Sequence, residues 1–433
     1  MRTRSLLLTA LLALVLPLLS TARELPTAKP EAIGLSGERL ARIDSVLQQH
    51  IKDGAIFNAV ALVARDGKLV HARAYGTLDL QGRTPMPVDA LFRMASSSKP
   101  VTSVAVLMLA EEGKLRLTDP VSRFIPSFKN LKVAVPKPGT VAPPTLPPGA
   151  PVTGPKPDAD LVPAQREVTI RDLLTHTSGL MSGGLGMRVS NDIQRKPADT
   201  LADFIPQLGN AALDFQPGTR WSYSAAAGFE TLGRIVEIAS GQPFDQFLAQ
   251  RIFAPLDMRD TQFVVPPAKQ GRMNQMYRRD AQGQWQPGAA SPFDSTVYFS
   301  GGGGLVSTAR DYLRFEQMLL NGGQLDGQRL LSPRSVEQMR TNHVGELFHG
   351  MRGNEDGMGF GLGIAVTLDE TVAVWRRSVG SAGWYGAFGT ISWNDPREGI
   401  AAVLMLQQSV PAVQNDFGTL VMQAIVESRP PRR

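Results

Sequence analysis

The chain has 433 residues, 42% of them hydrophobic, and a formal net charge of +6 at pH 7. This is enough apolar material for a full core in one large domain or two closely packed ones. The positive charge is spread along the chain without a run of five basic residues, so we expect no nucleic-acid partner. Because cysteine is absent, disulfides and a thiol nucleophile are excluded, although an oxidising compartment would be tolerated.

The N-terminus has the pattern of a secretory signal peptide. Two arginines precede an apolar run over residues 6–19, and the small residues Ser20 and Ala22 follow at the spacing of a cleavage site. The alternative is a membrane anchor, but the run is interrupted by Pro17 and is shorter than the roughly 20 residues that span a bilayer. We therefore predict a signal peptide at 1–22, a periplasmic or secreted protein, and no stable membrane anchor after cleavage.

The first predicted elements are a helix, a strand pair and a second helix. Ser36 precedes an amphipathic helix over 37–54, and residues 58–80 form two strands around the tight-turn pair Asp66-Gly67. A largely apolar helix starts near Ser96 and stops at Gly113. The segment 132–163 is rich in proline and lacks periodicity, so it is predicted to be an exposed loop or insertion.

The middle third is predicted to be mainly helical, and the C-terminal part returns to strands. Helical patterns cover 169–174, 202–208, 228–240 and 245–252, and a further helix capped by Ser307 and Thr308 runs to Leu319. A hairpin of 388–393 with 400–406 precedes a last helix over 410–426.

These elements predict an α+β fold in which both chain ends build one antiparallel sheet. Helices from the two termini would flank it, and the helical middle would be an insert. We assign residues 23–125 and 290–433 to the sheet domain. Residues 126–289, including the proline-rich loop 132–163, are assigned to the mainly helical domain.

Ser96 and Lys99 form a Ser-x-x-Lys pair at the start of the apolar helix. Helical spacing would place the two side chains on one face, where burial and the helix N-terminus favour a neutral lysine. A neutral amine beside a serine can activate it as a nucleophile. Such a pair also arises by chance in a chain of this length, so its position at a helix start carries more weight than its spacing.

Two other stretches carry candidate chemistry. Tyr223 follows the Pro217-Gly218 turn and precedes a helix that Ser222 or Ser224 could cap; it is a candidate proton relay, or a tyrosine that only packs there. Glycines recur through 380–390 before the last hairpin, where the backbone could approach a ligand or merely avoid crowding.

Other catalytic signatures are absent from the sequence. There is no Gly-x-Ser-x-Gly elbow and no His-Glu-x-x-His zinc motif, and the five histidines are scattered. His343 and His349 flank Glu346, which is more typical of a solvated loop than of a metal site. The four glycines at 301–304 lack the surroundings of a phosphate loop. We expect no metal and no cofactor.

Together these stretches resemble the serine β-lactamase and penicillin-binding-protein superfamily, and within it the class C-like esterases called family VIII. The resemblance runs from about residue 35 to 426 and rests on MASSSKPVTSVAVLMLAEEGKLRLTDPV at 94–121, TIRDLLTHTSGL at 169–180, GMGFGLGIAV at 357–366 and the WYGAFGT segment. It implies a β-lactamase/transpeptidase-like fold with the site between sheet and helical domain. It also implies Ser96 as the acylated nucleophile, Lys99 as its activating partner and Tyr223 as the proton relay.

Two departures from the family pattern favour the esterase branch. The β-lactamases and peptidases carry Tyr-x-Asn, but here the third position is Ala225, in a stretch that looks one residue longer than usual. Their cationic strand motif falls on Ser381-Ala382-Gly383 in one alignment, without a cation. The other alignment gives Trp384-Tyr385-Gly386, similar to the esterases' Trp-x-Gly, and predicts these three as substrate-binding residues. An aromatic wall suits neutral acyl esters.

The resemblance therefore implies an exported serine hydrolase that cleaves small esters through a Ser96 acyl-enzyme. The backbone N–H groups of Ser96 and of Tyr385 or Gly386 would hold the oxyanion. Two alternatives stay open: a β-lactamase or D-Ala-D-Ala-type peptidase, and a catalytically silent relative that binds cell-wall peptides. The sequence leaves open the acyl length, the role of the proline-rich loop and the oligomeric state.

Overall fold

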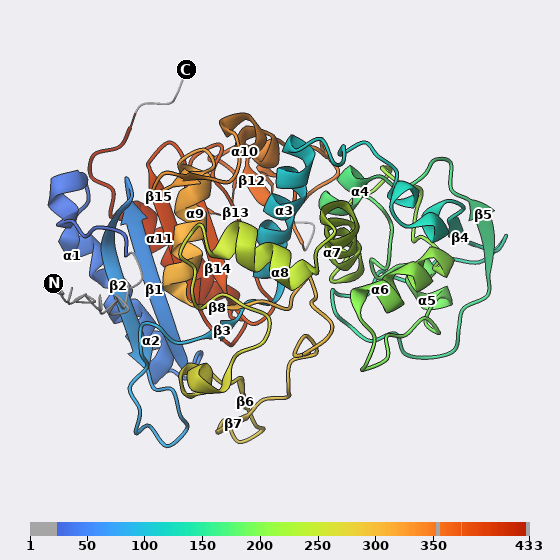
Figure 1. Ribbon diagram of the computed structural model, residues 1–433. Helices are drawn as coiled ribbons and strands as arrows, with labels where there is room; N and C mark the ends of the chain where they lie inside the picture. Colours follow the sequence, from blue (N-terminus) through green and yellow to red (C-terminus); the bar gives the residue numbers. More distant parts are fainter. Residues whose placement is uncertain (1–23, 352–355, 374, 430–433) are drawn as a thin grey trace, which may run out of the picture.

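The computed structural model describes residues 24–351, 356–373 and 375–429, so the predicted signal peptide at 1–22 lies outside the described residues. Figure 1 shows a sheet with its helices at the left of the view, and shorter helices with one ribbon at the right. The helix α3, Lys99–Glu111, lies between these two parts. The domain boundaries given above stay predictions.

The main sheet has seven antiparallel strands in the order β11-β12-β13-β14-β15-β1-β2. The N-terminal part supplies Asn58–Arg65 (β1) and Lys68–Gly76 (β2), and the C-terminal part supplies Met358–Phe360 (β11), Ala365–Thr367 (β12), Ala382–Tyr385 (β13), Ile391–Asp395 (β14) and Ile400–Met405 (β15). The two parts join where β1 pairs with β15, with Val60 opposite Met405. The prediction of one sheet built from both chain ends is confirmed.

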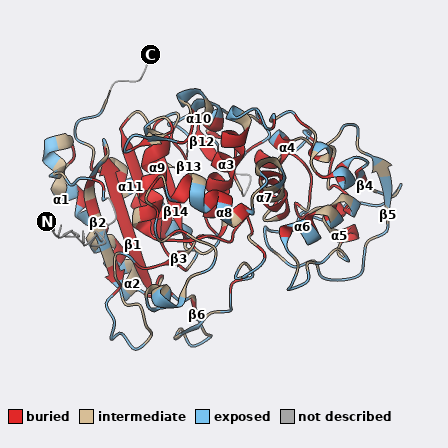
Figure 2. Cartoon of the chain, viewed as in Figure 1, coloured by how far each residue is buried: buried red, intermediate tan, exposed pale blue. Residues whose placement is uncertain are grey.

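Helices cover both faces of this sheet, so every residue of β1 is buried. Alternate residues of β1 pack in two different clusters, because successive side chains of a strand point to opposite faces. Ala59, Ala61 and Val63 pack with α1 (Gly37–Leu40), α2 (Arg42–Lys52) and α11 (Pro411–Gln423). Val60 and Leu62 belong to the larger cluster, which includes α3 and α9 (Ala309–Leu320). In Figure 2 the central strands and α3 are coloured almost entirely as buried.

The helical part consists of α4 (Ile170–Leu174), α5 (Leu185–Val189), α6 (Leu201–Phe204), α7 (Ala227–Ser240) and α8 (Phe244–Leu248). A capping box starts α4: Thr169 Oγ accepts from the Asp172 N–H, and the Asp172 carboxylate accepts from the Thr169 N–H. The helices α5 and α10 (Pro333–Arg340) were not predicted. The sequence did contain a signal for the start of α10, because Ser332 is its N-cap residue and Pro333 is its first residue.

The proline-rich segment 132–163 was predicted to be an exposed loop or insertion, and the loop prediction was wrong for its two ends. Its ends form an antiparallel ribbon of β4 (Lys132–Pro136) and β5 (Ala159–Pro163), with Lys132 opposite Pro163. The partners are separated by more than twenty residues without periodicity, so no local pattern could reveal the pairing. Three further ribbons are β3 with β8 (Phe92–Arg93, Val306–Ser307), β6 with β7 (Tyr277–Arg279, Trp285–Pro287) and β9 with β10 (Gln324–Leu325, Gln328–Arg329).

Some predicted boundaries also differ from the structure. The helix expected to start at Ser96 is preceded by a 3-10 turn, Ala95–Ser98, and α3 itself begins at Lys99. Thr308 caps α9 by accepting from Asp311 N–H, whereas Ser307 lies in β8. The last hairpin begins at Ile391 and not at Phe388.

Candidate active site

Ser96 lies in a constrained turn between β3 and α3. Ala95, the residue before it, is buried and has φ 44°, in the left-handed region that costs an L-residue about 1–2 kcal/mol. Neighbouring contacts hold this conformation: Met94 N–H donates to the Leu305 carbonyl at 2.8 Å, and Leu305 N–H donates to Ser98 Oγ at 3.1 Å. Strain of this kind persists only where the surroundings fix it, so the direction of the Ser96 side chain is set by packing.

Lys99 is completely buried, and its amine has three oxygen neighbours. The Nζ atom lies 3.1 Å from Ser96 Oγ, 2.7 Å from the Ala225 carbonyl and 2.8 Å from the Gly302 carbonyl. The two carbonyls can only accept, so they bind two N–H groups in either protonation state of the amine. The third position then faces Ser96, as an N–H in the ammonium form or as a lone pair in the neutral form. The predicted proximity of Ser96 and Lys99 is present.

Tyr223 lies next to this pair and contacts β13. Its side chain is 8% exposed, and its ring centroid is 4.9 Å from Lys99 Nζ. The indole Nε1–H of Trp384 donates to the Tyr223 hydroxyl at 3.4 Å. The N-cap residue of α7 is Ala226, although Ser224 Oγ accepts from the Gly228 N–H in the first turn of that helix. Ser222 instead donates to the Ser182 carbonyl. Ser96, Lys99, Tyr223 and Trp384 thus meet from three separate segments.

His176 supports Tyr223, and sequence reasoning missed it by treating the histidines as scattered. Its carbonyl accepts from Ser222 N–H at 3.0 Å and its Nδ1 accepts from Ser224 N–H at 3.2 Å, so it binds the amides on both sides of Tyr223. Its ring centroid lies 4.5 Å from that of Tyr223. Burial, with the charge of Lys99, lowers the pKa of His176 well below its usual value, so the ring is neutral. The only cue was its place in the 169–180 segment.

The end of β13 approaches the nucleophile turn closely. A Cβ on Gly386 would lie 2.2 Å from the Met94 carbonyl oxygen, so this position requires glycine. The Gly386 N–H donates to the Thr390 carbonyl at 2.8 Å, which corrects its assignment as an oxyanion donor. Because hydrogen bonding alternates along antiparallel strands, the Tyr385 N–H is directed away from β14. Of the two predicted strand donors, Gly386 is therefore excluded, and the role of the Tyr385 N–H stays a prediction.

The geometry also distinguishes the two alignments of the strand motif. Trp384 and Tyr385 line the cavity next to Ser96, with their rings stacked at 4.8 Å, whereas Ser381 is buried and does not line it. Trp384 itself is only 2% exposed. Most of its surface is covered by neighbouring residues such as Tyr223, so little of the ring is available to contact a substrate in the cavity.

A cavity of about 980 Å³ opens in front of Ser96. Tyr223, Tyr385 and Phe388 line it, and residues 145–149 of the proline-rich segment form part of its wall. Its described lining includes Arg220, an exposed residue three positions before Tyr223, and no carboxylate. The sequence argument had looked for a cation only on the strand and so did not find Arg220.

Within the described ranges, no three histidine or acidic side chains are grouped so as to hold a metal ion. Across the same ranges, no helix has both the length and the apolar composition that a membrane span requires.

Comparison with known proteins agrees with this architecture. The Beta-lactamase family model matches residues 43–426. Protein Rv1367c of Mycobacterium tuberculosis is 37% identical over 365 residues, covering 82% of this chain and 86% of that protein. Esterase EstB of Burkholderia gladioli is 31% identical over 422 residues, covering 92% of this chain and 97% of EstB. Among solved structures, EstCE1, a hydrolase with promiscuous acyltransferase activity, superposes with a TM-score of 0.70 at 27% identity, covering 90% and 99% of the two chains.

The fold is an antiparallel sheet with a helical part beside it, and a half-buried serine contacts a buried lysine at the start of a central helix. These features define a serine hydrolase. The chain belongs to the β-lactamase family, and its resemblance to the esterase branch is supported by EstB and EstCE1.

Proposed function

We propose that this protein is an exported esterase that cleaves small carboxylic esters through an acyl-enzyme on Ser96. The arrangement around Lys99 Nζ is the observation that carries the proposal. Two carbonyls, of Ala225 and Gly302, fix the amine so that its remaining position faces Ser96 Oγ at 3.1 Å. A neutral Lys99 would accept the serine proton directly through this contact.

In the first half-reaction, Ser96 Oγ attacks the ester carbonyl carbon while its proton moves to Lys99 Nζ. The oxyanion is held by the N–H groups of Ser96 and Tyr385. Collapse of this intermediate breaks the bond to the alcohol oxygen, which receives the proton through the Tyr223 hydroxyl. In the second half-reaction a water attacks the acyl-enzyme, its proton passes through Tyr223, and Ser96 leaves as a hydroxyl.

Two features support esters as the substrates. Ala225 places a methyl group in the cavity wall, where an amide side chain would recognise a peptide or β-lactam. The cavity also has an aromatic wall of Tyr385 and Phe388. Among the relatives, EstB is named an esterase, as is a lovastatin esterase of Penicillium rubens at 27% identity. The second candidate is a β-lactamase or D-Ala-D-Ala-type peptidase, and Arg220 is the feature that favours it, since it could bind a substrate carboxylate.

The test is replacement of Ser96 by alanine. Hydrolysis of nitrophenyl acetate and labelling by a fluorophosphonate should both disappear, while Ser97→Ala, a neighbouring serine in the same turn, should keep labelling. Full activity of the Ser96→Ala protein would overturn the proposal. Rapid turnover of nitrocefin or D-Ala-D-Ala peptides would select the second candidate, and no adduct with any ester or penicillin would indicate a silent cell-wall-binding relative. Export is tested by determining the N-terminus of the protein recovered from the periplasmic or secreted fraction. The mature chain should begin directly after Ala22.

A further inference from the structure

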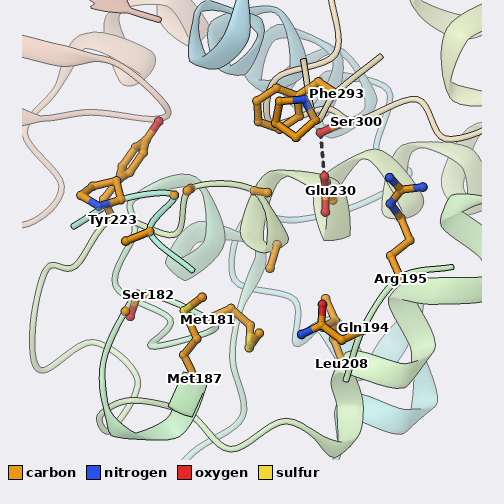
Figure 3. Close-up of a pocket in the computed structure, with 18 of the residues that line it drawn as sticks. Met181, Ser182, Met187, Gln194, Arg195, Leu208, Tyr223, Glu230, Phe293 and Ser300 are labelled. Carbon is orange, nitrogen blue, oxygen red and sulfur yellow. Dashed lines mark hydrogen bonds between the residues drawn. The ribbon is translucent and has the colours of Figure 1, made fainter. Parts of the chain in front are cut away.

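A second chamber, of about 330 Å³, opens beside the main cavity (Figure 3). It lies on the side of Tyr223 that faces α7 and the helical part of the molecule. The two spaces share nine lining residues, so they lie side by side at Tyr223 and Ala225. The shared lining residues are Leu146, Pro147, Pro148, Gly149, Ser182, Tyr223, Ala225, Pro292 and Phe293.

The surface of this chamber is mainly apolar. Figure 3 shows Met181, Met187 and Leu208 on one side of the space and Phe293 across from them. Apolar side chains that line a space next to a nucleophile are suited to a hydrocarbon group, because burying such a group removes its surface from water.

The polar groups in the wall already have partners. The Glu230 carboxyl accepts from Tyr298 Oη at 2.9 Å and from Ser300 Oγ at 2.7 Å, and burial raises its pKa. The Arg195 guanidinium lies over the Tyr298 ring at 4.5 Å. Because these groups bind one another, the chamber does not require a charged ligand.

We infer that this chamber binds the acyl group of the ester, and that the protein prefers medium-length aliphatic acyl groups over acetyl. The inference rests on the proposed function. In that reaction the alcohol must leave and water must arrive by the same open route, while the acyl group stays attached to Ser96. The larger cavity, which Ser96 lines, therefore serves the alcohol, and the smaller chamber beside Ala225 serves the acyl chain.

The size of the chamber sets the expected chain length. An apolar cavity of about 150 Å³ holds a benzene ring, so a space of 330 Å³ has room for roughly twice as many carbon atoms. Hexanoyl and octanoyl groups fit within this volume, whereas an acetyl group would leave most of the chamber empty. Each methylene buried in the transition state corresponds to about a fourfold gain in kcat/KM.

The proline-rich insertion forms part of this chamber through residues 146–150. We call residues 145–150 the strap. The strap is docked on the helical part, because Leu146 N–H donates to the Gly183 carbonyl at 2.8 Å. A side chain on Gly183 would collide with the strap, since its Cβ would lie 2.7 Å from the Leu146 carbonyl oxygen. The insertion thus helps to determine specificity.

Substitutions of Met187 test the inference, since this residue lines the chamber but not the main cavity. Its backbone N–H donates to Asp214 Oδ1, a contact that side-chain replacement retains. In the wild type, kcat/KM for nitrophenyl esters should rise from acetate to hexanoate. Met187→Phe should lower the hexanoate-to-acetate ratio at least about tenfold, and Met187→Ala should move the optimum to longer chains.

Met351→Ala is the matched control, because Met351 lines the main cavity and not the chamber. It should leave the ranking of acyl lengths unchanged. A wild type without preference for longer chains, or the same ranking in wild type and both Met187 variants, would overturn the inference even while nitrophenyl acetate is hydrolysed. If Met187→Phe does not fold, the wild-type profile and Met187→Ala still decide. Loss of hydrolysis of every ester would instead overturn the proposed function.

Discussion

Replacement of His176 by leucine should impair Tyr223 without altering Ser96 or Lys99. The change removes the acceptor of the Ser224 N–H and the ring that packs on Tyr223. It keeps the backbone carbonyl that binds Ser222 N–H. His176→Asn is the matched variant, because its side-chain oxygen replaces Nδ1 as an acceptor.

The magnitude follows from two local terms. Ser224 is buried, so its unpaired N–H costs about 1–3 kcal/mol. His176 has φ 57°, which costs a leucine about 1–2 kcal/mol but which asparagine tolerates. We expect His176→Leu to lower the free energy of unfolding by about 2–5 kcal/mol and His176→Asn by about 1 kcal/mol or less. Displacement of the Tyr223 hydroxyl by about 1 Å would lower kcat/KM up to about 100-fold.

The assay compares two leaving groups at a temperature where each variant is folded. An alkoxide leaving group needs a proton, which the proposed mechanism takes from Tyr223, whereas nitrophenolate is stable without one. His176→Leu should therefore lose more activity toward an alkyl ester than toward the nitrophenyl ester of the same acid, and His176→Asn should restore most of the difference. Equal losses on both esters, or unchanged kinetics in a folded leucine variant, would refute the positioning role.

Two further predictions concern Trp384 and Asp311. Trp384→Phe keeps an aromatic ring but removes the N–H that donates to the Tyr223 hydroxyl. The kcat for esters should therefore fall about three- to tenfold, with little change in melting temperature. An unchanged kcat would count against a role for this contact. Burial raises the pKa of Asp311 from 3.8 to about 6, so the folded state binds the proton more tightly than the unfolded state does. As the pH rises from about 4 to about 6, about 3 kcal/mol of the free energy of unfolding is therefore lost. Asp311→Asn should remove this slope in thermal unfolding scans over that range, and parallel curves for the two proteins would contradict the assignment.

Much of the frame could be predicted from local patterns. The Asp66-Gly67 turn and the apolar runs beside it predicted the β1–β2 hairpin, which is present. The spacing of Ser96 and Lys99 fixed their contact, because residues three apart in a helical turn share a face. The strands at both chain ends predicted a single sheet, and β1 does pair with β15. The catalytic roles of Ser96, Lys99 and Tyr223 stay predictions.

The site's remaining features depend on contacts between distant segments, which periodicity does not record. In the register of β13 against β14, the Gly386 N–H donates to the Thr390 carbonyl. The same register directs the Tyr385 N–H away from β14. Packing of the 169–180 segment brought His176 to Tyr223, and pairing of β4 with β5 brought the strap to the cavity. The sequence by itself determined which elements form and which serine has a lysine neighbour, since both depend on local spacing. The tertiary structure decided which amides, rings and loops surround that serine, because these contacts join residues that lie far apart in the chain.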